Sequence, residues 1–199
     1  MKFDKATIWA FVLLIVVGAV TRLLSYNIAG FAPQMAMALF GGAVIKDKKW
    51  AFALPLVSLL FSDALLEVLY QNNLVVRAGF YEGQWQTYLC FALVTVFGFL
   101  LRNINFKNVL IFSISGSLLF FIASNFFVWI GGGGFGRPIT FNGMLQCYTD
   151  ALAFYRDYGL IKGFIGNFIL GDMIWCAVLF GGYYLIMKAT ASPQHKLVV

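Results

Sequence analysis

Charged side chains are scarce in this 199-residue chain: Asp, Glu, Lys and Arg together make up 11% of it, whereas a soluble globular domain has about 25%. Hydrophobic residues make up 61%, and they come in long blocks rather than at amphipathic spacing. No Pro/Ser-rich linker or change of composition divides the chain. The sequence therefore predicts an all-α fold, a polytopic membrane protein that forms one bundle over residues 1–199.

Histidine and cysteine are also rare. The one histidine, His195, lies in the tail 189–199, which argues against a His-based triad, a zinc protease site or a haem site. The three cysteines, Cys90, Cys147 and Cys176, have no CxxC or metal-type spacing. A disulfide between Cys90 and Cys147 is one alternative, and buried free thiols are the one we favour. We expect no cofactor and no metal.

Six apolar blocks approach the length of a membrane-spanning helix, which needs about 20 mostly apolar residues. They cover residues 7–25, 31–45, 50–69, 85–101, 108–130 and 166–188. The second block is short and is interrupted at Gly41 and Gly42, so we expect its helix to pack inside the bundle.

Lysines and arginines are unevenly divided between the two ends of these blocks. Of the 14 in the chain, nine would lie at one end and five at the other. Because cytoplasmic loops carry the excess of Lys and Arg, we expect both termini in the cytoplasm and a multi-pass protein in the bacterial inner membrane. No basic stripe is interleaved with exposed aromatics, so the lipid bilayer rather than nucleic acid is the expected partner.

The connection 131–165 is the longest of the outer ones, and loops beyond about 15 residues are usually functional or disordered. Apolar side chains recur in it at helical spacing: Met144, Leu145, Tyr148, Leu152 and Tyr155. We therefore predict a short amphipathic helix across the outer mouth, hinged at glycines 131–134 and acting as a lid.

Ionisable and amide side chains interrupt the apolar blocks at six positions: Arg22, Asp63, Glu67, Asn125, Asn167 and Asp172. Such side chains are costly in lipid and are by default candidates for a functional site. The expected orientation puts all six in the outer half of the membrane, which suggests one outward-opening cavity. Trp129 and Trp175 would contribute its aromatic wall, and these eight residues are our candidate ligand-binding residues.

Each of these side chains also has a purely structural interpretation. Asp63 and Glu67 are one turn apart on one helix face, so they could bind a cation or a ligand with amines or hydroxyls. Otherwise Glu67 reaches the outer interface and Asp63 braces a neighbouring helix. Arg22 could pair with Asp63 or Asp172, or hold a ligand's carboxylate or phosphate as a planar fork. The buried amides and Asp172 could equally hydrogen-bond between helices.

Three stretches carry a resemblance to a known family: residues 31–43, residues 50–56 with Ser62-Asp63, and residues 166–172 with 179–181. They resemble a bacterial family of unknown function that is catalogued among candidate transport proteins, over most of residues 20–185. The six-span layout is also similar to the substrate-binding S-components of energy-coupling-factor (ECF) vitamin transporters.

The resemblance to S-components implies a ligand site near the outer face, under the loops. It also implies a coupling membrane subunit with ATPases, docked through an Ala-x-x-x-Ala pattern that Ala6 and Ala10 match. The third block lacks the cysteine that engages the metal in a related cobalamin-binding type, which argues against cobalamin.

We therefore expect a substrate-binding membrane protein, not an enzyme, for uptake of a small vitamin-like molecule. The glycine run at 131–134 lacks the Gly-Lys-Ser/Thr ending of a phosphate loop, so energy would come from a partner ATPase, an ion gradient or trapping. The alternative is a non-transporting integral-membrane subunit or scaffold of a larger complex. An intramembrane enzyme with carboxylates as acid and base is a third and weaker hypothesis, because histidine and a dense aspartate motif are missing.

Overall fold

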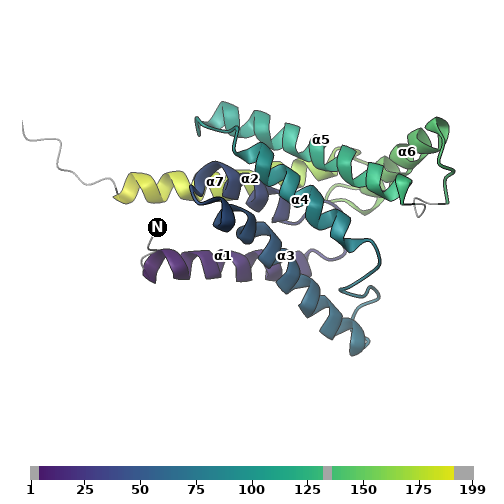
Figure 1. Cartoon of the computed structure of the whole chain (residues 1–199), viewed down its shortest axis with the longest axis horizontal. Helices are drawn as coiled ribbons and strands as arrows, with labels where there is room; N and C mark the ends of the chain where they lie inside the picture. The colour runs from purple at the N-terminus through teal and green to yellow at the C-terminus, as the bar shows by residue number, and fades with distance from the viewer. Residues whose placement is uncertain (1–4, 132–135, 191–199) are drawn as a thin grey trace, which may run out of the picture.

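The computed structural model describes residues 5–131 and 136–190, the first three of them by backbone alone, and in these ranges the chain is all helical. Seven helices follow one another: α1 (Lys5–Leu24), α2 (Gln34–Val44), α3 (Lys48–Gln71), α4 (Gln84–Gly98), α5 (Phe106–Ile130), α6 (Phe141–Tyr158) and α7 (Asn167–Thr190). The start of α1 and the end of α7 lie at one end of the bundle, on the left in Figure 1. Helix α6 and the connection from α3 to α4 lie at the other end.

Three of the helices, α3, α5 and α7, are long and apolar enough to cross a membrane. Two shorter helical stretches are also apolar: Ile8–Leu24, which is part of α1, and the whole of α2. Large apolar side chains are exposed along the helices, among them Trp9 at 72% and Ile122 at 56%, which lipid accommodates and water does not. The chain is thus a membrane protein, while the six-span arrangement and its orientation stay predictions.

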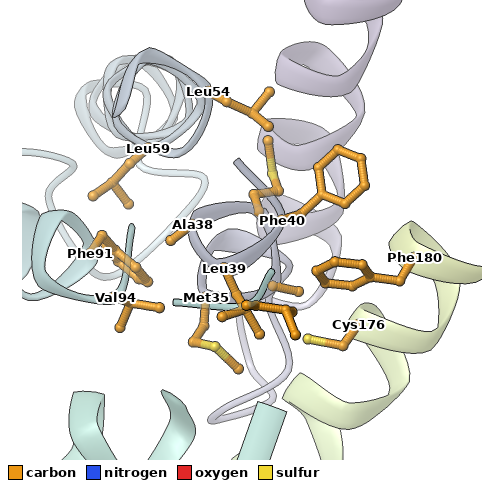
Figure 2. Close-up of a cluster of buried hydrophobic side chains, with 13 residues drawn as sticks. Met35, Ala38, Leu39, Phe40, Leu54, Leu59, Phe91, Val94, Cys176 and Phe180 are labelled. Atoms are coloured by element: carbon orange, nitrogen blue, oxygen red, sulfur yellow. The ribbon is translucent and has the colours of Figure 1, made fainter. Parts of the chain in front are cut away.

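Helix α2 lies at the centre of the bundle. Nine of its residues, Gln34 to Gly42, are buried, and it packs against α3, α4, α5 and α7. Figure 2 shows α2 side chains within a cluster to which three neighbouring helices contribute: Leu54 and Leu59 of α3, Phe91 and Val94 of α4, and Cys176 and Phe180 of α7. The expectation that the short second block packs inside the bundle is confirmed.

Glycines allow this close packing. A Cβ atom on Gly42 would lie 2.2 Å from the backbone oxygen of Thr95 and 2.9 Å from Cα of Gly98. A Cβ atom on Gly41 would lie 2.7 Å from the backbone oxygen of Ala51. The two glycines that interrupt the second block are therefore the positions at which the backbones of α3 and α4 approach α2.

Side chains at the start of three helices cap free backbone N–H groups. The Asp47 carboxylate accepts a hydrogen bond from Lys49 N at 3.0 Å, the Asn105 side chain accepts one from Asn108 N at 2.9 Å, and Thr140 Oγ1 accepts one from Gly143 N at 3.1 Å. These polar residues set where α3, α5 and α6 begin.

Helix α6 forms inside the connection 131–165, as predicted, and lies against α5 and α7. Its buried positions, Gly143, Cys147 and Ala151, recur every four residues, which is the pattern of an amphipathic helix. Burial, together with the charge of Asp172, raises the pKa of Tyr155 to about 12. Of the predicted hinge, residues 132–134 lie outside the described ranges.

All three cysteines are buried free thiols. This is the alternative that the sequence analysis favoured, and Cys90 and Cys147 form no disulfide. The predicted tail begins later than expected, because α7 continues to Thr190 and residues 191–199 lie outside the described ranges.

Candidate functional site

A buried ion pair joins the first and third helices. Asp63 on α3 is 1% exposed, and its Oδ1 accepts a hydrogen bond from Nη1 of Arg22 on α1. The same nitrogen donates to Ser62 Oγ at 2.5 Å. Of the two partners considered for Arg22, Asp63 and Asp172, the structure shows the first.

Helix α4 satisfies the other oxygen of this carboxylate. Asp63 Oδ2 accepts hydrogen bonds from Gln84 Nε2 at 2.6 Å and from the Tyr88 hydroxyl at 2.7 Å. A buried carboxylate is tolerated when it is both paired and hydrogen-bonded, and here donors from α1 and α4 supply both. The sequence analysis missed Gln84 and Tyr88, although their spacing of four at the start of the fourth block places them on one helix face.

A cavity of about 570 Å³ lies beside this pair. Its walls are the end of α1 with the turn that follows it, the end of α3, and the connection between α3 and α4. Six of its lining residues have polar or charged side chains: Arg22, Ser25, Tyr26, Asp63, Arg77 and Tyr81. The cavity is therefore polar on the side of the ion pair and of the connection.

Glu67 holds the connection 72–83 against α3. Its Oε2 accepts hydrogen bonds from the backbone N–H groups of Gly79 at 3.0 Å and Phe80 at 3.2 Å, and its Oε1 accepts one from Gln71 at 3.1 Å. A Cβ atom on Gly79 would lie 1.9 Å from the backbone oxygen of Asp63, so only glycine lets the connection approach this closely. Glu67 thus shapes one wall of the cavity.

The connection also contacts the end of α1. The backbone N–H of Arg77 donates to the Tyr26 hydroxyl at 2.9 Å, and the Arg77 guanidinium lies 5.8 Å from the centroid of the Tyr26 ring, within the range of a cation–π contact. A second arginine is thereby held at the cavity.

Asp172 lies elsewhere, between α5 and α7. It is buried, and its Oδ2 accepts a hydrogen bond from Ser117 Oγ at 2.7 Å. Asp172 does not line the cavity beside the Arg22–Asp63 pair. Helix α2 packs against both α3, which carries Asp63, and α7, which carries Asp172. Trp175, nearly one turn further along α7, packs on Phe31 with ring centroids 5.7 Å apart.

Asn167 organises the connection from α6 to α7. Its Oδ1 accepts a hydrogen bond from Ile161 N at 2.7 Å. Its Nδ2 lies 2.5 Å from the backbone oxygen of Phe164, 2.8 Å from that of Ile161 and 3.0 Å from that of Tyr155. Both polar atoms of the amide therefore have backbone partners, and Asn167 has a structural role in this connection.

Two further candidate residues also bond to backbone. Asn125 Nδ2 donates to the backbone oxygen of Phe121, on the same helix, at 2.8 Å. Trp129 Nε1 donates to the backbone oxygen of Pro138 at 3.1 Å, which ties the segment before α6 to α5.

The structure thus brings two of the eight candidate residues, Arg22 and Asp63, together at one cavity and uses Glu67 to build its wall. The other candidates have partners in other parts of the bundle: Asn125, Trp129, Asn167, Asp172 and Trp175. A hydropathy pattern indicates how deep a residue lies in the membrane but not its angle around the bundle, so residues of similar depth need not meet.

Within the described ranges, no three His, Cys, Asp or Glu side chains gather into a potential metal site. Of the two alanines of the predicted docking pattern, Ala10 is exposed on α1, and the side chain of Ala6 lies outside the described part of the chain.

A family model described as a family of unknown function (DUF6580) matches residues 3–195. No curated protein and no solved structure matches the chain significantly. The family match agrees with the first resemblance in its coarse form, a family of unknown function, and carries no statement on transport or on S-components.

Proposed function

The chain belongs to DUF6580, a family of unknown function, and from its cavity we propose that it is a membrane substrate-binding protein for a small molecule. The observation that carries this proposal is the cavity of about 570 Å³ beside the Arg22–Asp63 pair. Ligand sites are usually cavities of about 300–1,000 Å³ with a few placed polar groups, and this cavity meets both criteria.

The ion pair itself supports a binding role. Its two ends differ in accessibility, since the Asp63 side chain is 1% exposed and the Arg22 side chain 24%. Asp63 and Ser62 both bind Nη1 of the guanidinium, and the same arginine lines the cavity. A side chain oriented before the ligand arrives loses less conformational freedom on binding.

In this proposal the cavity opens to the outside of a bacterial inner membrane, and six spans leave both termini in the cytoplasm. The Lys/Arg distribution supports this orientation. The connection 72–83 lies at the end of the bundle opposite the start of α1 and the end of α7 (Figure 1), so with the termini inside it would face outward.

In this proposal the connection 72–83, in place of the predicted lid at 131–165, covers the cavity. None of the described residues of the connection 131–165 lines the cavity, whereas four residues of the connection 72–83 do: Arg77, Ala78, Gly79 and Tyr81. We therefore assign the covering role to the connection between α3 and α4.

The energy for uptake would come from a partner ATPase, an ion gradient or trapping, because the sequence has no nucleotide-binding motif. In the S-component-like form of the proposal, a coupling membrane subunit with ATPases docks on α1 near Ala6 and Ala10. The exposed Ala10, beside Trp9 at 72% exposure, supports a face of α1 that is open to lipid or to such a subunit.

Mass spectrometry of small molecules released from protein purified in mild detergent tests the binding role. We expect wild-type protein to carry a ligand, and Ala32→Trp to lose it, because Ala32 lines the cavity and an indole there fills the space without changing charge. Ala78→Trp fills the same cavity from the connection, which provides a second variant if the first does not fold.

Leu93→Trp is the matched control, since Leu93 is 41% exposed on α4 and does not line the cavity. It should keep the ligand. Equal ligand content in wild type and in both folded cavity variants would contradict the proposal.

The second candidate is a non-transporting subunit in which the polar residues brace helices. The observation in its favour is that both oxygens of Asp63 already have partners within the chain, on α1 and α4. It predicts stable co-isolation with a larger complex, and a less stable protein without any ligand loss for Asp63→Asn.

A further inference from the structure

The charged side chains that line the cavity are two arginines and one aspartate: Arg22, Arg77 and Asp63. The aspartate contributes little to the cavity surface, because it is 1% exposed. Both of its oxygens already accept hydrogen bonds, one from Arg22 and the other from Gln84 and Tyr88. A cationic or amine ligand would therefore have to displace existing donors to reach this carboxylate.

Arg22, in contrast, still has donors to offer. Both hydrogen bonds that its guanidinium makes within the described residues leave from Nη1, to Ser62 Oγ and Asp63 Oδ1. A guanidinium carries five N–H donors in a rigid fork, so the N–H groups on Nε and Nη2 stay available on a side chain that is 24% exposed at the cavity.

Arg77 adds a second positive charge from the connection. The ion pairs found in the described part of the chain do not include it, and its guanidinium contacts the face of Tyr26 instead. The Tyr26 hydroxyl accepts a hydrogen bond from the Arg77 backbone, so its own proton is free to be donated. Side chains from two walls of the cavity thus present donors and positive charge.

We propose that the ligand of this cavity carries a carboxylate or phosphate group, and that Arg22 and Arg77 bind it; this inference rests on the proposed binding function. The planar fork of arginine matches both groups and can bind them through two parallel hydrogen bonds. Among the residues that line the cavity, Arg22 neutralises the one carboxylate, Asp63, and Arg77 adds a further positive charge that attracts an anion. The Glu67 carboxylate lies behind the wall, where both of its oxygens already accept hydrogen bonds from Gln71, Gly79 and Phe80.

A soluble anion and an anionic lipid headgroup share this chemistry, and two sets of probes separate them. Full-length protein in phosphate-free mild detergent is titrated with sodium phosphate, with sodium benzoate and with the cation benzyltrimethylammonium, and binding is measured by isothermal titration calorimetry. Nanodiscs of phosphatidylcholine with and without phosphatidylglycerol provide the lipid probe, with bound lipid measured by native mass spectrometry.

We expect at least one anionic probe to bind and the cation not to bind. Arg77→Gln should weaken that binding by about ten-fold or more, since hydrogen bonds to charged groups are among the stronger ones. Arg156→Gln is the matched control, because it removes an exposed arginine that pairs with Asp157 on α6 away from the cavity. It should bind as wild type does.

Loss of phosphate or benzoate binding in Arg77→Gln identifies a soluble anion, and loss of retained phosphatidylglycerol identifies a headgroup; both support the inference. Unchanged anion binding in Arg77→Gln and Arg22→Lys, or tighter binding of the cation, would overturn it.

If Ala32→Trp loses the co-purified ligand while Arg77→Gln keeps it, the binding function stands and the anion inference fails. If Ala32→Trp also keeps it, the binding function itself fails.

Discussion

At the scale of single residues, the cost of a polar side chain in an apolar block could be predicted, but its partner could not. Asp63 and Asn167 both interrupt such blocks. The first forms an ion pair with another helix, while the second bonds to the backbone of its own neighbouring connection. Asn167 finds backbone partners because the connection from α6 to α7 passes beside it. The spacing of residues in the sequence does not predict the path of that connection.

A double-mutant cycle on Arg22→Gln and Asp63→Asn should show coupling of about 1–3 kcal/mol in the free energy of unfolding, as contacting residues in one network do. Each single change leaves a polar partner without its ion pair at a buried site. The double mutant should therefore lose less stability than the sum of the two single losses. The measurement is reversible unfolding in mild detergent.

The same cycle on Arg156 and Asp157 is the control. Their side chains are 47% and 51% exposed, and exposed ion pairs contribute little to stability. Coupling as strong in the exposed pair as in the buried one would show that burial adds nothing to the Arg22–Asp63 interaction.

At the scale of helices, block length and the residues that start or interrupt a helix were informative. The predicted block 31–45 contains α2, Gln34–Val44, and its glycines mark the closest contacts of that helix. Helix α3, Lys48–Gln71, is longer than the predicted block 50–69. It begins two residues before the block because Asp47 caps it, and hydropathy does not register a cap. Helix ends therefore depend on single polar residues that a hydropathy window averages away.

Gly42→Ala should lower the free energy of unfolding by about 1–3 kcal/mol, the usual cost of overpacking a well-packed core. The new methyl group would lie 2.2 Å from the backbone oxygen of Thr95, and a backbone atom cannot move aside as the end of a flexible side chain can. Unfolding in mild detergent measures the effect.

Gly181→Ala is the matched control on α7, since a Cβ atom there meets no atom within 4 Å. It should leave stability unchanged or raise it by up to about 1 kcal/mol, as removing a glycine from a helix interior does. Equal losses in both variants would mean that the α2–α4 contact is not the cause.

At the scale of the whole molecule, six apolar blocks and one amphipathic segment were predicted, and the described ranges contain seven helices at the corresponding places. Three of them are long and apolar enough to span a membrane by themselves. In Figure 1, α1, α3 and α5 run from the end of the bundle that holds the start of α1 toward the opposite end, and α7 returns. The number of crossings and the orientation stay predictions that need a chemical test.

With both termini in the cytoplasm, a reporter fused after Val199 should be active only as a cytoplasmic one. A cysteine at Lys162→Cys, in the connection before α7, should react with an impermeant maleimide on intact cells, and one at Arg102→Cys only after permeabilisation. The three native cysteines are buried, so background labelling should be low. Labelling of Arg102→Cys on intact cells would reverse the orientation.

The sequence alone determined that this is an all-helical membrane protein, that its second helix is short and internal, and that polar side chains inside apolar blocks are the places to examine. Those properties depend on composition and on local spacing. Only the tertiary structure decided that Arg22 meets Asp63, that Glu67 holds a cavity wall, and that Asp172 lies elsewhere, with α2 packed against both α3 and α7. The physical reason is that hydropathy reports depth in the membrane, whereas packing around α2 sets the angle at which each side chain points and so selects its partner.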